Sequence, residues 1–358
     1  MKKIFQTILF IFSTFTFAIG QEKISIMPNP QKIWIELGES KKYVNFDFLV
    51  QNNSSDTLTL SKIVATVFDK HNHIIHQRFL DNNGTAPSIQ TIPNRSFTGQ
   101  ERKLIFNPFS EFDLGIALDK IEFQFTFIST KNDETIVKTV INPQNYKQKQ
   151  SYVFPLKGKI LVYDAHDYYS HHRRFDYEFA PIKQLGFTSN FMRYAYDFVM
   201  LDSANNQYVG KNDKPESYFG YGQKVYAVAD GSVIYASNKH KDDATFDIPE
   251  LANNALELYG NCIAIQHQDS SISIYGHLMQ NSIKVKVGNI IRAKQAIASI
   301  GISGSSFFPH LHFEIRTSIK NSAEGLPSYF SNIFILATEK YLKLKSGLPE
   351  TGSIITTK

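Results

Sequence analysis

Alternation of apolar and polar residues with a period of two is the feature that most constrains the fold of this chain. Apolar side chains occupy every second position of "VNFDF" (44–48) and of "IEFQFTF" (121–127). Such alternation is typical of strands that have one buried and one solvated face. Because the intervening segments are short and rich in Asn, Asp, Ser and Gly, which favour hairpin reversals, the pattern predicts an all-β chain.

A chain of 358 residues is long enough for two domains, and its local composition suggests where the boundary lies. Residues 21–149 predict an immunoglobulin-like β-sandwich of about 100 residues. The polar, proline-containing stretch 142–150 is the predicted linker. Residues 151–342 predict a second domain built from an antiparallel β-sheet, and residues 343–358 are expected to form a loose tail.

Two segments of the second domain depart from the strand pattern. "LANNALELY" (251–259) and "NIFILATEKYLKL" (332–344) have helical periodicity. Elsewhere strand-like segments recur, and the turn residues 268–271 predict a hairpin. Cys262 lies in an apolar strand-like stretch and is expected in the core.

Residues 1–20 have the composition of a secretory signal peptide. Lys2 and Lys3 precede an apolar core at 4–17, and small residues follow it. This core is shorter than the ~20 apolar residues that span a bilayer, which argues against a membrane anchor. We therefore expect export, and a soluble mature protein in the periplasm or outside the cell.

Charge and cysteine content narrow the function classes further. The net charge of +5, from 38 basic and 33 acidic residues, is too mild to indicate nucleic-acid binding. With Cys262 as the single cysteine, the exported chain folds without an internal disulfide.

The segment "PHLHFEIR" (309–316) carries two histidines one residue apart. On a strand this spacing turns His310 and His312 to one face and Leu311 and Phe313 to the other. Neighbouring imidazoles of this kind are metal ligands or an acid/base pair, although the pattern also arises by chance on solvated sheet faces.

Other histidines differ in their surroundings. His277 ends the strand-like segment 271–278, and the Gly/Ser-rich loop 301–306 allows a tight turn on the way to His310. In "HNHIIH" (71–76), by contrast, the three histidines cannot share one strand face, so we interpret them as surface and turn residues rather than a metal site.

Several short motifs, in this order, resemble the lysostaphin-like (LytM-type) zinc metallopeptidases. They are "GQKVYAVADGSVIYA" (222–236), "YGHL" (275–278), "VKVGNIIRAKQAIASIG" (285–301), "SGSS" (303–306) and "PHLHFEIR" (309–316). The resemblance covers 194–316 and implies a β-sheet domain that hydrolyses peptide bonds in the cross-links or stem peptides of peptidoglycan.

The resemblance also implies roles for individual residues. His312 would bind zinc, and His277 and His310 would flank the attacking water and the scissile carbonyl. The carboxylate ligand would be Asp197. Arg193 stands where the family has its first histidine ligand, and a guanidinium has no lone pair to offer a metal.

Three outcomes remain open at that position. In the first, a histidine of "SHHRRFDY", His172 or its neighbour His171, joins Asp197 and His312 as a zinc ligand; alternatively His172 and Asp176 form the true first motif. In the second, Arg193 pairs with Asp197 and replaces the metal. In the third, a site with two ligands binds zinc weakly.

Two functional hypotheses follow from these outcomes. The favoured one is an exported zinc metalloendopeptidase that acts on peptidoglycan, because His277, His310 and His312 are all present. Its rival is a catalytically inactive groove that binds cell-wall peptide or regulates another wall hydrolase. An extracellular adhesive β-protein would leave the clustered histidines without a role. In each case the N-terminal domain would contact the wall or another envelope protein.

Overall fold

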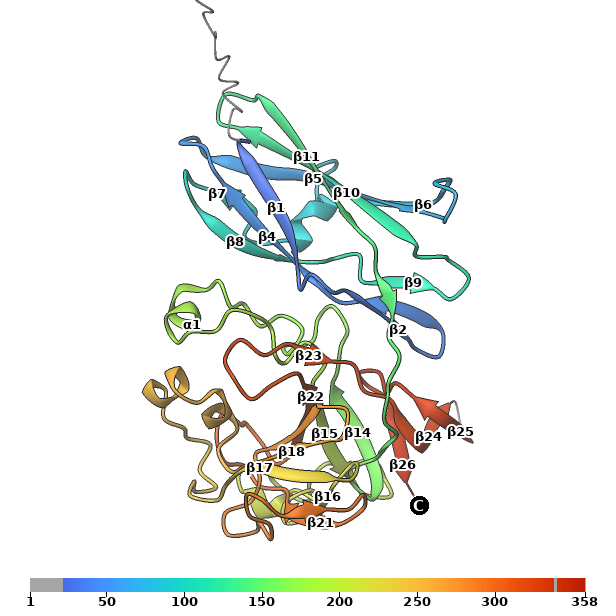
Figure 1. Ribbon diagram of the computed structural model, residues 1–358, viewed down its shortest axis with the longest axis vertical. Coiled ribbons are helices and arrows are strands. Elements are labelled where there is room, and N and C mark those ends of the chain that lie inside the picture. The colour runs from blue at the N-terminus through green and yellow to red at the C-terminus, as the bar shows by residue number, and fades with distance from the viewer. Residues whose placement is uncertain (1–21, 338–339, 358) are drawn as a thin grey trace, which may run out of the picture.

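The computed structural model describes residues 22–337 and 340–357, so the predicted signal peptide lies outside the described residues. The structure is mostly β, as the alternation predicts. N-terminal sheets occupy one end of the long axis and a large C-terminal sheet occupies the other (Figure 1). Every helix within the described ranges falls short of the length and apolar character that crossing a membrane requires.

The N-terminal part consists of three sheets and one short 3₁₀ helix, η1 (Ser88–Thr91). The first sheet has the order β11 (Glu134–Ile141), β10 (Lys120–Ser129), β5 (Leu58–Phe68) and β6 (Ile74–Leu80), with β7 (Ser96–Phe97) beside β5. The second has the order β1 (Ile24–Asn29), β4 (Asp47–Asn52) and β8 (Arg102–Phe106). The third has the order β12 (Gln144–Asn145), β2 (Trp34–Leu37), β3 (Lys41–Val44) and β9 (Glu111–Asp113).

Alternating aromatic residues fill the N-terminal core. The ring of Phe48 lies edge-on to the rings of Phe123 and Phe125, with centroids 4.9 Å apart in both pairs. All three side chains are fully buried, and edge-to-face contacts of this kind add to the effect of burial. The assignment of this part to the immunoglobulin class stays a prediction.

The C-terminal part is a curled sheet that resembles half a barrel (Figure 1). Its order is β13 (Tyr152–Val153), β24 (Phe330–Ala337), β26 (Ile354–Thr357), β14 (Gly158–Asp164), β15 (Tyr196–Leu201), β22 (Leu311–Arg316), β19 (Ile272–Gly276), β18 (Cys262–Gln266), β17 (Gly231–Ser237) and β20 (Ile290–Ile291). In addition, β23 (Gly325–Leu326) pairs with β22 and β25 (Lys340–Gly347) pairs with β24, while β16 (Lys224–Tyr226) and β21 (Ala296–Ser299) form a separate pair. Short helices lie in the connections: α1 (Ala180–Gln184), η2 (Pro215–Ser217), η3 (Pro249–Ala252) and η4 (Ala255–Tyr259).

The end of the chain differs from the prediction in two ways. The segment 343–358, expected to be loose, contributes to the sheet in its described part, because the end of β25 pairs with β24 and β26 pairs with both β14 and β24. The described residues of the segment 332–344, expected to be helical, instead lie in β24 and β25, which pair antiparallel. The second half of this segment alternates Leu342 and Leu344 with polar neighbours, and pairing with β24 satisfies the backbone groups on that side of β25.

Three smaller predictions have clear outcomes. The hairpin at 268–271 is confirmed, since β18 and β19 pair antiparallel around it, and Cys262 is fully buried. The segment 251–259 forms the two short 3₁₀ helices η3 and η4 rather than one α-helix. In the 71–76 segment, His71 and His73 are exposed turn residues.

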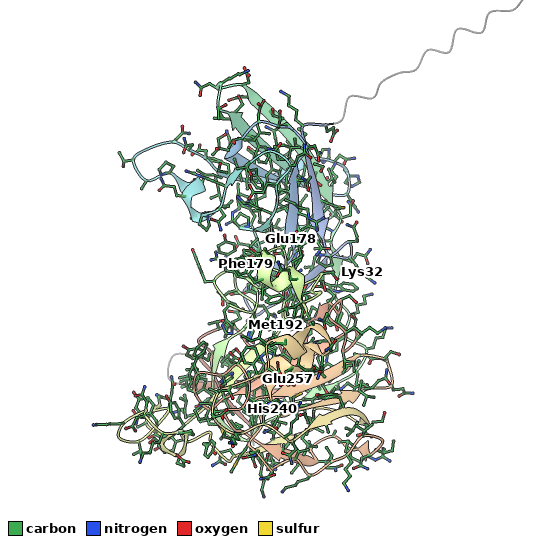
Figure 2. The ribbon with its side chains drawn as sticks, turned by 90° about the vertical axis from the view of Figure 1, so that its left-hand side faces the viewer. Lys32, Glu178, Phe179, Met192, His240 and Glu257 are labelled. Atoms are coloured by element: carbon green, nitrogen blue, oxygen red, sulfur yellow. The ribbon has the colours of Figure 1, made fainter. Side chains whose placement is uncertain are left out.

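The two halves meet through apolar and charged contacts. Leu104 of β8 belongs to the same buried cluster as Tyr177 and Phe191 of the C-terminal part. Glu178, labelled at the waist of the molecule in Figure 2, accepts a hydrogen bond of 2.9 Å from Nε of Arg102. The N-terminal part is therefore docked on the segment that leads into β15.

Candidate metal centre

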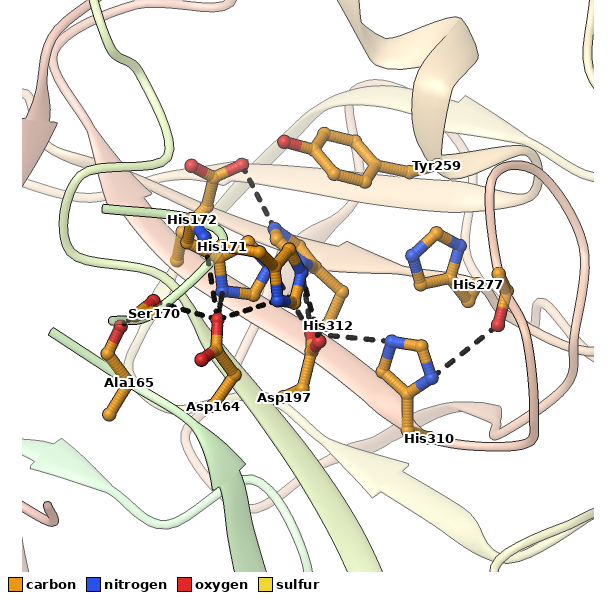
Figure 3. Close-up of polar contacts among 12 residues, drawn as sticks. Asp164, Ala165, Ser170, His171, His172, Asp197, Tyr259, His277, His310 and His312 are labelled. Atoms are coloured by element: carbon orange, nitrogen blue, oxygen red, sulfur yellow. Dashed lines mark hydrogen bonds and ion pairs between the residues drawn. The ribbon is translucent and has the colours of Figure 1, made fainter. Parts of the chain in front are cut away.

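The central strands of the C-terminal sheet align the predicted site residues. β15 and β22 pair so that Asp197 lies opposite His312, and β19 and β22 pair so that Gly276 also lies opposite His312. Because His277 directly follows Gly276, sheet register alone brings residues from three strands to one place (Figure 3). His277 has a φ of 57°, in the left-handed region that residues with a side chain rarely occupy.

Strand β22 divides its side chains as the alternation predicts. Leu311, Phe313 and Ile315 are fully buried in the core of the sheet. His312 lies on the opposite face, where Nε2 is 3.4 Å from Oε1 of Glu314. A carboxylate acceptor at Nε2 holds the proton there and leaves the Nδ1 lone pair free to bind a metal.

His172 completes the group from a different part of the chain. Its Nε2 lies 3.5 Å from Oδ1 of Asp197, and Nδ1 of His312 lies 3.3 Å from the same oxygen. One ligand atom from each of these three buried residues lies within 4.8 Å of the others. His171 approaches too, with Nε2 3.6 Å from Oδ2 of Asp197, but its side chain is 63% exposed.

Arg193 lies elsewhere, and the outcome in which it pairs with Asp197 is wrong. Its Nη1 lies 2.6 Å from Asp47 and its Nε 2.6 Å from Glu324, and these are its ion-pair partners within the described ranges. The alternative motif of His172 and Asp176 also fails, because the carboxylates beside His172 are Asp164 and Asp197, while Asp176 accepts hydrogen bonds from backbone amides of its own turn.

The two predicted catalytic histidines flank the three-residue group. Nε2 of His310 lies 3.2 Å from Oδ1 of Asp197, and the rings of His277 and His310 are 4.8 Å apart. Nδ1 of His310 lies 2.8 Å from the carbonyl oxygen of Phe308, and Nδ1 of His277 lies 2.8 Å from that of Ser303. Since a carbonyl oxygen only accepts, Nδ1 carries the proton in the neutral ring of His277, which leaves its Nε2 lone pair free, whereas both nitrogens of His310 face acceptors, the Phe308 carbonyl and Asp197.

Burial and neighbouring charges shift the protonation of these groups. Burial alone would raise the pKa of Asp197, but His310 and His172 lower that pKa well below the usual range of a carboxyl group. Burial, together with the neighbouring His310 and His312, lowers the pKa of His277 well below its ordinary value. His277 is therefore neutral at neutral pH, and Asp197 is an anion.

Asp164 supports the group, and sequence reasoning missed it. It ends β14 and lies opposite Asp197 in the sheet register. Its Oδ2 is 2.9 Å from Nδ1 of both His171 and His172, and accepts a 2.7 Å hydrogen bond from Ser170. No local motif marks this residue, because its role depends on the pairing of two strands that are distant in sequence.

The donor set fits zinc. Two imidazoles and one carboxylate are the three protein ligands typical of zinc sites that keep a position open for water or substrate. The cluster also favours a cation, because Asp197 and Glu314 outweigh burial and raise the pKa of His312. A His/Asp cluster suited to a metal is thus present, with its ligands presented by β15, β22 and the 170–174 segment.

A β-sheet domain that gathers histidines and a carboxylate in this way has the ligand types of a metalloprotein. The profile described as "Peptidase family M23" matches residues 218–324. "Lipoprotein NlpD" of Yersinia enterocolitica is 37% identical over 95 residues, which are 26% of this chain and 78% of that protein. The chain belongs to peptidase family M23, the lysostaphin/LytM-like group that the motifs indicated.

Longer relatives and solved structures overlap this chain only in part. "Murein hydrolase activator NlpD" of Escherichia coli is 38% identical over 95 residues, and the match spans 20% of that protein's length. The catalytic domain of the antimicrobial peptidase lysostaphin from Staphylococcus simulans is 23% identical, with 47% of this chain and 88% of that chain covered and a TM-score of 0.27. The family match includes His277, His310 and His312, whereas His172 and Asp197 precede it.

Proposed function

We propose that this protein is an exported zinc metalloendopeptidase that hydrolyses peptide bonds in the cross-links or stem peptides of peptidoglycan. The observation that carries the proposal is the convergence of His172, Asp197 and His312, with His277 and His310 beside them. Membership of family M23 supports peptidoglycan as the substrate.

The geometry suggests a role for each side chain. His172 would bind the metal through Nε2, His312 through Nδ1 and Asp197 through its carboxylate. A zinc ion held there would supply a bound water with a pKa of about 7 and would polarise the substrate carbonyl.

His277 and His310 are suited to proton transfer. The Nδ1 proton of His277 is held by a backbone carbonyl oxygen, so its Nε2 can accept a proton from the attacking water, and Nε2 of His310 would be able to do so once Asp197 is bound to the metal. The imidazolium that results can donate to the developing oxyanion or protonate the leaving amine. Fixing Nδ1 on the backbone keeps each ring oriented for these transfers.

Location and targeting belong to the same proposal. The predicted signal peptide would place the protein in the periplasm or outside the cell, where peptidoglycan is accessible. The N-terminal sheets would then hold the peptidase part against the wall or against another envelope protein.

Zinc content and wall hydrolysis test the proposal together. The purified protein should contain about one zinc per chain and release muropeptides from purified peptidoglycan. His312→Ala should lose both properties, and His310→Ala should keep zinc but lose hydrolysis, whereas the exposed-site control His73→Ala should keep both. A metal-free protein, or His310→Ala with wild-type hydrolysis, contradicts these roles.

A second candidate function is regulation of another wall hydrolase. It is supported by the similarity to proteins named murein hydrolase activators. Such a protein would release no muropeptides alone but would increase their release by a separate wall hydrolase, and His310→Ala would retain this effect.

A further inference from the structure

The segment that presents His172 is held by residues of the N-terminal part. Arg173, the next residue, is fully buried. Its Nε donates to Oδ1 of Asn45 at 3.1 Å, its Nη1 pairs with Asp47, and its Nη2 donates to the carbonyl oxygen of Phe46. All the polar contacts that the Arg173 guanidinium makes within the described ranges therefore reach into the N-terminal part.

The same carboxylate also holds Arg193. Oδ2 of Asp47 lies 2.6 Å from Nη1 of Arg193, whose Nε contacts Glu324 at 2.6 Å. Arg193 is four residues before Asp197, where the family resemblance expects the first histidine ligand. Asp47 is fully buried and contacts two arginines. Arg193 stands at the position of the family's first histidine ligand, and Arg173 directly follows His172, the histidine proposed to bind zinc instead.

A second clamp holds the start of this segment. Nδ1 of His166 lies 2.7 Å from Oε2 of Glu36, and Oε1 of Glu36 accepts a 2.9 Å hydrogen bond from Asn45. Both His166 and Glu36 are buried. The turn residues between His166 and Arg173 are therefore fixed to the N-terminal part at both ends.

We propose that the N-terminal part completes the metal site: its docking through Asp47 and Arg173 positions His172, so that docking and zinc binding are coupled. This inference rests on the proposed zinc site. Coupling between two binding events is reciprocal, so bound zinc should also tighten the docking. Asp47 is a positioning residue in this account, because it contacts neither the metal ligands nor the substrate.

The loss of zinc affinity expected when Asp47 is replaced depends on which contacts still hold the His172 segment. An uncharged side chain there leaves two buried guanidinium groups without their shared counter-ion, which favours movement of Arg173 and its neighbour. Asp164 still contacts His172, and Ser170 still donates to Asp164, so the segment keeps a hold within the C-terminal part. We therefore expect zinc affinity to fall by roughly 10–100-fold, as for other residues that orient a ligand, without being abolished.

Competition with a chromogenic zinc chelator measures this effect in the full chain. Asp47→Asn keeps the shape of the side chain and should weaken zinc binding, while Asp47→Glu should restore part of the affinity. Tyr43→Phe is the matched control, because the Tyr43 hydroxyl joins the two halves at Glu350 (2.7 Å), away from the His172 segment. Zinc affinity in Asp47→Asn equal to that of Tyr43→Phe overturns the inference.

Hydrogen exchange of the unaltered protein provides a test that does not depend on folding of a variant. Added zinc should slow exchange of the backbone amides of residues 44–47 as well as 170–174. Protection confined to β15 and β22 overturns the coupling but leaves the zinc site intact. A wild-type protein that binds no zinc overturns the proposed function and the coupling with it.

Discussion

Replacing Arg193 by histidine separates two accounts of this position. If Arg193 occupied the metal's place, Arg193→His would recreate the family's first ligand and increase zinc binding. In the structure its guanidinium instead contacts Asp47 and Glu324, each at 2.6 Å, and is fully buried. We therefore expect the substitution to lower stability and to leave zinc affinity no higher than in the wild type.

The magnitude follows from the contacts that are lost. Removing one partner of a buried ion pair costs about 3–5 kcal/mol. Asp47 retains Arg173, and Glu324 is 20% exposed and can be hydrated, so the cost should be near the lower value, about 3 kcal/mol. With about 2–4 °C per kcal/mol for large domains, the thermal midpoint should fall by roughly 6–12 °C.

Differential scanning calorimetry and zinc competition measure the two effects in one preparation. Arg292→His is the matched control, because Arg292 pairs with Asp230 on the surface, where ion pairs contribute about 0–1 kcal/mol. An Arg193→His protein that keeps the wild-type midpoint, or that binds zinc more tightly, would refute this view of the position.

Two further predictions concern the core of the C-terminal part. Burial lowers the pKa of His267 below its ordinary 6.5. The neutral form of His267 therefore stabilises the fold above pH 6.5, and this contribution is lost as the pH falls through the pKa of His267 in the folded protein. Between about pH 7 and about pH 5 the thermal midpoint should fall less in His267→Gln than in the wild type. Equal falls would contradict the pKa shift. Gly304 has a φ of +76°, and an added Cβ would lie 2.4 Å from the backbone nitrogen of Gly260. Gly304→Ala should therefore lower the free energy of unfolding by about 2 kcal/mol or more, as measured by calorimetry. Gly352→Ala should lower it less, because φ is also positive there but the space is open. Equal losses of stability would contradict the steric argument.

Local pattern was sufficient for much of the site. Period-two alternation predicts that His310 and His312 share a face of a strand and that Leu311 and Phe313 are buried; β22 shows this division from Leu311 on, while His310 directly precedes the strand. His277 at the end of a neighbouring strand follows from the same reasoning. These predictions succeed because strand geometry depends on adjacent residues.

Other features depend on contacts between residues that are distant in the sequence, and local sequence patterns do not reveal such contacts. One partner of Arg193 is Asp47 of β4, which is 146 residues away. Asp164 acquires its role because β14 and β15 pair and place it opposite Asp197. The described residues of the segment 332–344 pair as β24 and β25 although its apolar residues also fit helical spacing, because strand pairing is a long-range contact and the alternation at Leu342 and Leu344 is short.

The position of bound zinc tests the central claim most directly. Crystals of the zinc-loaded protein should show one strong anomalous peak at the zinc edge, about 2.0–2.2 Å from Nε2 of His172, Nδ1 of His312 and a carboxylate oxygen of Asp197. A peak bound by His171 in place of His172, or the absence of a peak at Asp197, would contradict the account.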